Sequence, residues 1–512
     1  MIRNYLLPIL ALLVLAMGCS KDSIPTAEVQ PNDPEPLSRT EINEFVLQEL
    51  KATGEAFSWE KANDEMLWSA ISHGQELAVI GYQPEGFENI NERIHEIDVT
   101  EDEWRNVRRE LIQLVLEETQ KYFPDENITE KDLTMDVPAE EDIPAFDILI
   151  KHPAIVSALR QRADVRYVEP MGYTYTEVND RSGSGCDVSP NYSIPSADFT
   201  TISPSAKVPW NFNLLNIPSA WNTSQGDNIG ICVIDTGTSP NQSKLGSQFA
   251  SGQSTSRYIA KYGTHISGMW WWASNDGPDD DCGHGTQMAG LAAGPRSSGG
   301  STVGAAYKAN LITVRGTTDV IVNTSSEKNG VKDALILAGN RSDVRIISMS
   351  IGDIFSSSKV ADGVRYAYNR GKLIFAAAGT SLTWTSWWGV IFPANMSETV
   401  AVTGVKEGYP LQRCSNCHDG SQVDFIVPMQ RRNDNGRTSL TLAMSGNTPA
   451  YVGGSSAATA TTAGVAALVW ATSPGSSRST IMNRLKNAAS IYPSRDGNFG
   501  WGIIDANYAV NN

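Results

Sequence analysis

Short apolar runs alternate with helical patterns throughout the C-terminal part of the chain. From residue 208 onward, the runs that are apolar on both faces are 229–234, 311–314, 344–349, 373–376 and 400–403. The stretches with helical spacing are 330–340, 358–370, 456–472 and 478–489. Strands buried on both faces that alternate with helices indicate a parallel sheet covered on each side. The pattern therefore predicts an α/β domain over 208–512, with a doubly wound, mainly parallel sheet flanked by helices.

The region between residues 41 and 180 has a different pattern. Apolar positions recur at helical spacing within 41–122. The stretch 145–170 then predicts a strand, a helix and a strand, over 146–151, 153–163 and 165–170. A Ser- and Gly-rich stretch, 179–185, marks a boundary. We therefore expect an α+β region over 41–180 and a linker or processing segment over 181–207.

The first forty residues have the features of a targeting segment and a tether. Arg3 precedes a short apolar stretch, 6–16, and Gly18 stands directly before Cys19. An apolar stretch this short is typical of a signal peptide rather than of a membrane-spanning helix. The Gly18-Cys19 pair resembles a bacterial lipoprotein processing site. It predicts a signal peptide over 1–18, lipid on Cys19 and a polar, Pro-rich tether over 19–40.

Cleavage by ordinary signal peptidase is the alternative, and both routes export the chain. Lipidation predicts an outer-membrane lipoprotein, anchored before processing and either exposed on the surface or released afterwards. No internal apolar run reaches the ~18 residues of a membrane span.

Charge divides the chain into an acidic N-terminal part and a mildly basic remainder. Of the 57 acidic residues, 36 lie within 21–180, against 14 basic ones there, and the whole chain carries a formal net charge of -17. This balance argues against a nucleic-acid partner held by phosphate contacts. The two parts either present unrelated surfaces or bind each other, since opposite charge favours docking.

Three residues with catalytic chemistry stand where strands end or helices begin. Asp235 directly follows the apolar run 229–234, and Ser456 begins the Ala- and Gly-rich helical stretch 456–472. Taken singly, such residues are usually helix caps or members of ion pairs. His284 lies between two glycines at the head of a small-residue helix, which suggests close approach of the backbone to a neighbour.

Together the three residues match the requirements of nucleophilic catalysis. A serine hydroxyl needs an imidazole to take its proton, and the imidazole needs a carboxylate to hold its tautomer. A helix N-terminus at the serine offers N–H groups to a developing oxyanion. The chain order Asp, His, Ser is the subtilisin order.

Three segments carry a resemblance to a known family: Val233-Ile-Asp-Thr-Gly237, Gly283-His-Gly-Thr286 and Gly454-Ser-Ser-Ala-Ala458. In these motifs the chain resembles the subtilisin-like serine proteases over roughly 205–512. The resemblance implies a subtilisin-like fold and an endopeptidase with Ser456 as nucleophile, His284 as general base and acid, and Asp235 as its orienting carboxylate. Protein or peptide substrates are implied, and no cofactor is required for the chemistry. The residues implied to bind substrate are Ser350, Ile351, Gly352, Ala378 and Gly379.

The end of the acidic region, 148–170, resembles the end of a subtilase propeptide. This implies that 41–180 is a pro-region which ends in an inhibitor-like subdomain, and that the enzyme is made as a self-inhibited zymogen. Its own pro-region would then be its inhibitor.

The oxyanion hole departs from the family pattern. Thr380 stands where the family has an Asn side-chain donor, so the resemblance implies a hole formed by Thr380 and the backbone N–H of Ser456. Loss of such a donor in a subtilisin costs ~10²–10³ in kcat, although Thr can still donate from its hydroxyl. Two alternatives therefore stay open: a weakened relative that mainly binds peptides, and a non-proteolytic serine hydrolase such as an esterase.

Six cysteines are too few for a disulfide scaffold. In an exported chain, the Cys414-Ser-Asn-Cys417 segment favours a local disulfide over a metal site. A second disulfide between Cys186 and Cys282 is a hypothesis by elimination. We assign no metal ligand. The acidic loop at Asp276, Asp279, Asp280 and Asp281 leaves open a structural calcium site or a solvated loop, and the tryptophans 270–272, 384, 387 and 388 leave open core packing or cleft walls.

Overall fold

The computed structural model describes residues 34–134, 142–175, 186, 193–268, 273–380 and 389–512. By their contacts, Pro36–Asn512 form one compact unit, distinct from Met1–Glu35. The predicted signal peptide, Cys19 and most of the tether lie outside the described residues. The first helix begins at Arg39 with a capping box between Ser38 and Glu41, so regular structure starts inside the segment predicted as tether.

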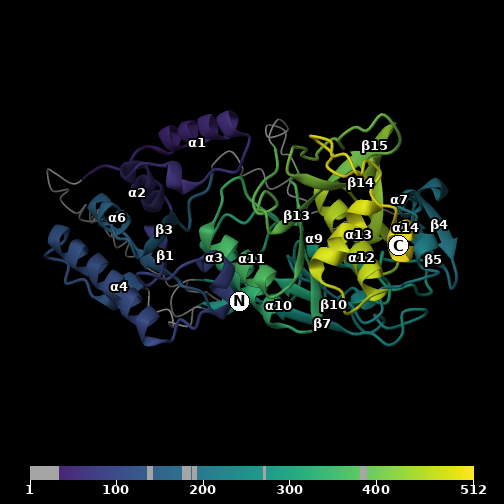
Figure 1. The fold of residues 1–512 in the computed structure, drawn as a ribbon, viewed down its shortest axis with the longest axis horizontal. Coiled ribbons are helices and arrows are strands. Elements are labelled where there is room, and N and C mark those ends of the chain that lie inside the picture. The colour runs from purple at the N-terminus through teal and green to yellow at the C-terminus, as the bar shows by residue number, and fades with distance from the viewer. Residues whose placement is uncertain (1–33, 135–141, 176–185, 187–192, 269–272, 381–388) are drawn as a thin grey trace, which may run out of the picture. The chain divides into compact units, whose positions relative to one another are not determined.

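The N-terminal region is α+β, as predicted (Figure 1). A three-stranded antiparallel sheet has the order β2-β1-β3. The long helix α4 buries Trp104, Leu111 and Val115 on one face, which is the helical spacing seen in the sequence. The elements are α1 Arg39–Thr53, α2 Asp64–His73, β1 Leu77–Tyr82, α3 Ile90–Arg93, α4 Asp102–Tyr122, α5 Glu130–Thr134, β2 Ala145–Leu149, α6 Pro153–Arg160 and β3 Val165–Pro170.

The C-terminal domain is built on a sheet that has nine strands within the described residues, in the order β16-β15-β14-β13-β12-β11-β6-β10-β7. The strands from β14 to β7 are parallel, and β15 and β16 add antiparallel pairs. All five predicted strands are present and central. The strands, in sheet order, are Pro449–Val452, Asp434–Leu442, Val423–Arg431, Thr399–Lys406, Leu373–Ala377, Val344–Met349, Gly230–Asp235, Asn310–Arg315 and Ile259–Gly263.

Helices cover this sheet, and two short hairpins stand outside it. The helices are α7 Trp210–Leu214, α8 Ile217–Ala220, α9 His284–Ala293, α10 Ser325–Asn340, α11 Ser358–Asn369, α12 Gly454–Ala471, α13 Arg478–Asn487 and α14 Ala506–Asn511. The hairpins are β4 Phe199–Ile202 with β5 Ala206–Pro209, and β8 Ile266–Ser267 with β9 Ser274–Asn275. None of the helices in the described part of the chain is long and apolar enough to cross a membrane.

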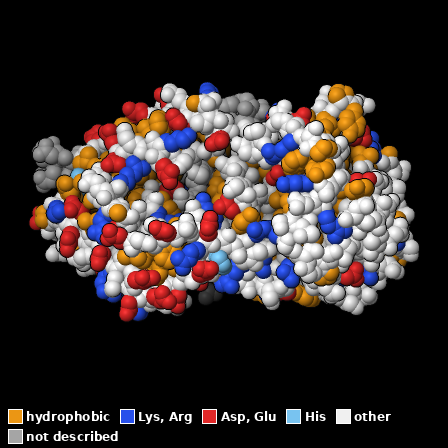
Figure 2. All heavy atoms as spheres, viewed as in Figure 1, with side chains coloured by type: hydrophobic (Ala, Val, Ile, Leu, Met, Phe, Trp, Pro, Cys, Tyr) orange, Lys and Arg blue, Asp and Glu red, His pale blue; other side chains and the backbone are white. Residues whose placement is uncertain are grey.

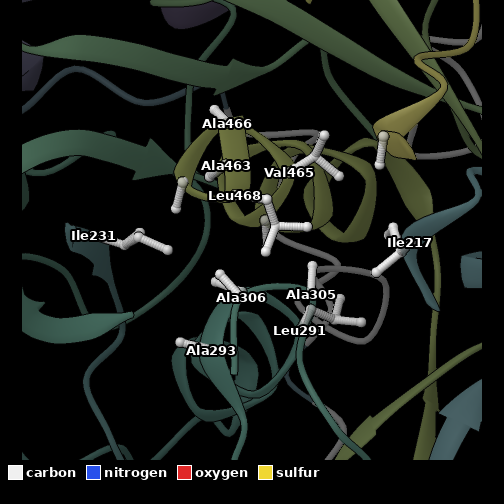
Figure 3. Packing of buried hydrophobic residues seen from close by; sticks show 14 of the residues in the cluster. Ile217, Ile231, Leu291, Ala293, Ala305, Ala306, Ala463, Val465, Ala466 and Leu468 are labelled. Carbon is white, nitrogen blue, oxygen red and sulfur yellow. The ribbon is translucent and has the colours of Figure 1, made fainter. Parts of the chain in front are cut away.

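Small residues let two helices pack closely in the core of the domain. Figure 3 shows side chains of α12, among them Ala463 and Leu468, facing Leu291 of α9 and the neighbouring Ala305. A Cβ on Gly464 of α12 would lie 2.7 Å from the Ala305 Cβ and 2.8 Å from a backbone oxygen of α9. Only glycine fits there, so the Ala- and Gly-rich composition of α12 brings the starts of both helices to one end of the sheet.

The N-terminal region contacts helices α10 and α11 through ion pairs of both polarities. Arg166 of β3 binds Asp362 of α11 through two hydrogen bonds of 2.8 Å, whereas Asp147 of β2 accepts from Lys359 at 2.9 Å. Figure 2 shows acidic side chains gathered around α4, away from the C-terminal sheet. Local ion pairs of both polarities therefore contribute to the contact between the two parts.

An aromatic cluster completes this contact. Phe355 of the C-terminal domain is 3% exposed and stacks on Trp59, with ring centroids 5.5 Å apart and planes at 6°. Phe57 and Tyr173 meet the same ring edge-on. The backbone pairs too, since Phe57 N donates to Ile354 O at 2.8 Å. Phe355 is thus part of the hydrophobic core of the N-terminal region.

The second half of the predicted linker, 181–207, is fixed to the C-terminal sheet by a buried carboxylate. Asp198 is fully buried and accepts hydrogen bonds from Arg431 Nε at 3.1 Å and Arg437 Nε at 2.8 Å. The Tyr451 hydroxyl donates to the same carboxylate. Chain from about residue 196 onward therefore belongs to the C-terminal domain.

Candidate active site

The site begins at the carboxyl end of β6, in the middle of the parallel sheet. Asp235 ends this strand between β10 and β11 and is 1% exposed. Its Oδ1 accepts a hydrogen bond from Thr236 N at 2.8 Å. Active residues gather at such ends in parallel sheets, which is where the sequence placed Asp235.

His284 is the first residue of α9, and its ring contacts Asp235. The distance from His284 Nδ1 to Asp235 Oδ1 is 2.8 Å, and the imidazole is buried. The flanking glycines explain this closeness. Gly283 has a φ of 92°, and a Cβ on Gly285 would lie 2.3 Å from Gly237 O. The close backbone approach predicted from the two glycines is confirmed.

Opposing effects act on the His284 ring. Burial disfavours the charged imidazolium, but the carboxylates of Asp235, Asp280 and Asp319 outweigh it and raise the pKa of His284 above its ordinary value. With Nδ1 facing a carboxylate, Nε2 is the nitrogen that can accept a proton. The pair therefore has the arrangement of a general base with its orienting group.

Ser456 lies in the first turn of α12, where backbone N–H groups have no helical acceptor. Its Oγ approaches Ser350 O at 3.4 Å, and Ser350 Oγ donates to Ser456 O at 3.0 Å. Within the described residues, no hydrogen bond joins Ser456 to His284. The structure thus brings Ser456 to the predicted substrate segment but leaves the predicted nucleophile and the predicted base without a hydrogen bond between them.

Thr380 lies against the same helix N-terminus. Its Oγ1 is 3.0 Å from Ser455 Oγ, which also accepts from Gly379 N at 3.2 Å. A Cβ on Gly454 would lie 2.9 Å from Thr380 Oγ1, so the hydroxyl contacts the first residue of α12. Ser455 was not among the predicted site residues. Its position directly before Ser456 is the sequence signal that could have identified it.

The predicted substrate-binding segment is already paired within the chain. Gly352 N donates to Val320 O at 3.0 Å, and Val322 N donates to Gly352 O at 3.1 Å. Ala378 and Gly379 also use their N–H groups internally. The Ile351 side chain is buried. An extended peptide can pair with Gly352 only after 320–322 moves away.

Both cysteine pairs form disulfides: Cys414 with Cys417, and Cys186 with Cys282. The Cys414–Cys417 turn supports the Thr380 segment, since Thr380 and Cys417 form a β-bridge and His418 N donates to Gly379 O at 2.9 Å. Burial raises the pKa of the Cys232 thiol to about 12, which makes it an inert core residue.

The sequence interpretation named Asp280 in the acidic loop but missed its role as a helix cap. Asp280 is 2% exposed, and its carboxylate accepts five hydrogen bonds. It is buried rather than solvated, and the described residues hold no group of three or more His, Cys, Asp or Glu arranged for a metal ion. An Asp in the turn before a helix is a capping signal, but the neighbouring acidic residues concealed which one caps. The tryptophans 270–272, 384, 387 and 388 lie outside the described residues.

Comparison with known proteins gives a consistent result. Residues 226–502 match the sequence profile of the subtilase family. The chain is 28% identical to thermitase of Thermoactinomyces vulgaris over 298 residues, which cover 58% of this chain and 93% of thermitase. It is 27% identical to subtilisin Savinase of Lederbergia lenta, over 59% of this chain and 98% of Savinase.

A solved structure extends the likeness in fold beyond that domain. Fervidolysin from Fervidobacterium pennivorans, described as a keratinolytic enzyme related to subtilisin, superposes with a TM-score of 0.58. The superposition covers 85% of this chain and 61% of fervidolysin, at 16% identity. At that identity the likeness concerns the fold alone.

Proposed function

The chain belongs to the subtilase family, and on that premise we propose that it is an exported serine endopeptidase made in a latent form. The observation that carries the proposal is the 2.8 Å contact between His284 and Asp235 beside the α12 N-terminus. Ser456 is the nucleophile, His284 the general base and acid, and Asp235 the carboxylate that orients the imidazole.

The geometry supports a two-step hydrolysis. Asp235 accepts the Nδ1 proton of His284, so the Nε2 lone pair takes the Ser456 hydroxyl proton as Oγ attacks the peptide carbonyl carbon. His284 then gives this proton to the leaving amine, which leaves an acyl-enzyme ester. Water deprotonated by His284 cleaves the ester and regenerates Ser456.

Oxyanion stabilisation comes from the start of α12. The Ser456 N–H lies in the first turn, where no helical carbonyl accepts from it. Thr380 adds a hydroxyl donor when Ser455 donates to Thr380 Oγ1, because the Thr380 proton is then free to point away from Ser455. Catalysis also requires the Ser456 side chain to rotate from Ser350 O toward His284.

Latency is supported by the closed substrate segment. Gly352 is paired with 320–322, and the following residues, 354–356, pair with Phe57 of the N-terminal region. Removal of the N-terminal region would free 354–356 and expose Phe355. We place the cleavage between residues 176 and 195, because Tyr175 is buried in the N-terminal core and Asp198 is buried against the C-terminal sheet.

Intact mass and N-terminal sequencing of the purified wild type beside Ser456→Ala test the function. We expect the wild type to lose its N-terminal third and the variant to keep it. Retention by both proteins, with no cleavage of added casein, contradicts the proposal. Latency is tested separately, since turnover of a small peptide substrate is expected to rise when the N-terminal third is removed, and equal rates contradict it.

Export and lipidation at Cys19 are a separate part of the proposal, supported by the sequence alone. Mass analysis of the membrane fraction of producing cells, with Cys19→Ser as control, tests for the added lipid.

A peptide-binding role is the second candidate. The bond from Ser456 to Ser350, rather than to His284, favours it. Binding of peptides with equal affinity by wild type and Ser456→Ala, without hydrolysis, would support this candidate. The ratio of peptide to ester turnover separates a peptidase from an esterase.

A further inference from the structure

The carboxylate of Asp280 accepts hydrogen bonds from the backbone on both sides of the catalytic histidine. Its Oδ1 accepts from Cys282 N at 3.0 Å, from Gly283 N at 2.6 Å and from the Thr236 hydroxyl at 2.9 Å. Its Oδ2 accepts from the backbone N of Thr286 at 2.9 Å and from the Thr286 hydroxyl at 2.6 Å. Both oxygens are therefore fully used in a buried position.

These bonds satisfy the N-terminus of α9. The helix begins at His284 itself, and the residue before it, Gly283, has no side chain to act as a cap. The first N–H groups of a helix lack intrahelical acceptors and carry partial positive charge. Asp280 supplies the missing cap and the negative charge from three residues farther back.

The same carboxylate connects α9 to the strand that carries Asp235. Thr236 donates its hydroxyl proton to Asp280, and its oxygen accepts from Gly285 N at 2.9 Å. Thr236 N in turn donates to Asp235 Oδ1 at 2.8 Å. A continuous network thus joins the two catalytic residues by a second route, besides their direct contact.

The loop that carries Asp280 is itself held from outside. Arg315, at the end of β10, donates to Asp279 O at 2.6 Å, and Thr238 N donates to Pro278 O at 2.9 Å. The Cys186–Cys282 disulfide fixes the other side of the loop. The Asp280 carboxylate is consequently placed by three independent attachments.

We propose that Asp280 is a positioning residue for catalysis, which sets the start of α9 so that His284 keeps its bond to Asp235. The proposal rests on the proposed function. It assigns to Asp280 a role through His284 and no contact with substrate.

Asp280→Asn is the main test, with Asp279→Asn as matched control. The amide turns one acceptor into a donor that faces N–H groups, whereas Asp279 is exposed and loses the same charge one residue away. We expect kcat to fall about 10- to 100-fold with KM within about twofold for Asp280→Asn. We expect the control to match the wild type.

The pH profile is a second readout, which would not change if Asp280 had a purely structural role. The carboxylates that face His284 are Asp235 on β6, Asp280 before α9 and Asp319 after β10. Loss of one negative charge lowers the pKa of His284, so the acid limb of kcat/KM shifts to lower pH in Asp280→Asn. An unchanged limb and kcat together with a lowered Tm would reduce Asp280 to a structural residue and overturn the proposal.

A measurement without turnover separates this proposal from the proposed function. In the Ser456→Ala protein, the far-downfield proton resonance of His284 Nδ1 reports the bond to Asp235. We expect it to shift or broaden on adding Asp280→Asn and to persist on adding Asp279→Asn. Persistence in both double variants overturns the positioning role even if the wild type proves inactive.

Thr236→Val provides a milder variant if Asp280→Asn fails to fold. It removes the hydroxyl that links Thr236 to Asp280 and Gly285 at nearly constant volume. We expect a fall in kcat of the same kind, rescued in Thr236→Ser, which restores the hydroxyl. Equal kcat in Thr236→Val and wild type contradicts the network.

Discussion

His284 is the residue at which burial and charge oppose each other most directly. A buried imidazole resists protonation, yet three carboxylates lie close enough to reverse that preference. The His284 imidazole is thus held with an elevated proton affinity, which strengthens it as a base and narrows the pH range in which it is neutral.

The first prediction concerns the acid limb of activity. His284 must be neutral to accept the Ser456 proton, and its pKa is raised above 6.5. Activity should therefore be half-lost at a pH above 6.5 and vanish as the pH falls further. The measurement is kcat/KM for a peptide substrate from pH 5 to pH 9. A limb centred below 6.5 contradicts the prediction.

The second prediction concerns the Thr380 hydroxyl. Thr380→Val keeps the volume of the side chain and removes its donor, so kcat should fall about 10- to 100-fold while KM is kept. Thr380→Ser retains the hydroxyl and should stay within a few-fold of the wild type. Equal kcat in Thr380→Val and the wild type would show that the backbone N–H of Ser456 stabilises the oxyanion without the Thr380 hydroxyl.

At the scale of elements, the position of α9 depends on contact between backbones. Gly285 packs on Gly237, so the helix that bears His284 meets the end of β6 with no side chain between them. Protein interiors are closely packed, so a displacement of α9 is transmitted to the His284–Asp235 pair.

Gly285→Ala is the third prediction. The added methyl would lie 2.3 Å from Gly237 O, which forces α9 away from β6. We expect a loss of stability of ~1–3 kcal/mol and a loss of kcat. Gly475→Ala is the control, since nothing lies within 4 Å of a Cβ there. Full activity of Gly285→Ala would show that the helix can shift without disturbing the site.

The apolar runs predicted the central strands because those strands are buried on both faces. Strands β7, β15 and β16 were missed because they are only partly buried, whereas β14 is largely buried but Asp424 and Pro428 interrupt its apolar run. β7 is half-buried and contains Lys261, and the first half of β15 is exposed and polar. The capping role of Asp280 was missed because three other Asp residues lie in the same loop and the sequence does not show which one is buried. Local pattern predicted the scaffold and the three candidate catalytic residues, but not the contacts that hold them.

At the scale of the whole molecule, a few buried charges hold the N-terminal region to the C-terminal domain. Asp362 is fully buried and pairs with Arg166 at 2.8 Å and with Arg365 at 3.3 Å, while the Tyr167 hydroxyl donates to it at 2.9 Å. Arg166 makes the bidentate bond across the interface, so its removal leaves the buried Asp362 charge only partly compensated.

Arg166→Met is the fourth prediction. In the Ser456→Ala background, which prevents self-cleavage, we expect a loss of ~3–5 kcal/mol in stability, measured by urea unfolding. Arg105→Met is the matched control, because the Arg105–Asp102 pair is 57% and 89% exposed and should contribute little. Equal unfolding midpoints in the two variants would show that the Arg166–Asp362 pair contributes little to the interface.

The Cys186–Cys282 bridge turns part of the chain into a covalent ring, because it joins residues 96 positions apart. A single cut within that ring leaves the two pieces joined by the disulfide, whereas a cut before Cys186 leaves no covalent bond between them. The position of a single cut therefore decides whether the N-terminal piece stays covalently attached to the C-terminal domain or is separated from it. After a cut inside the ring, the disulfide still joins the two pieces. A reductant, rather than a second protease, would then break the last covalent link between the C-terminal domain and the N-terminal region.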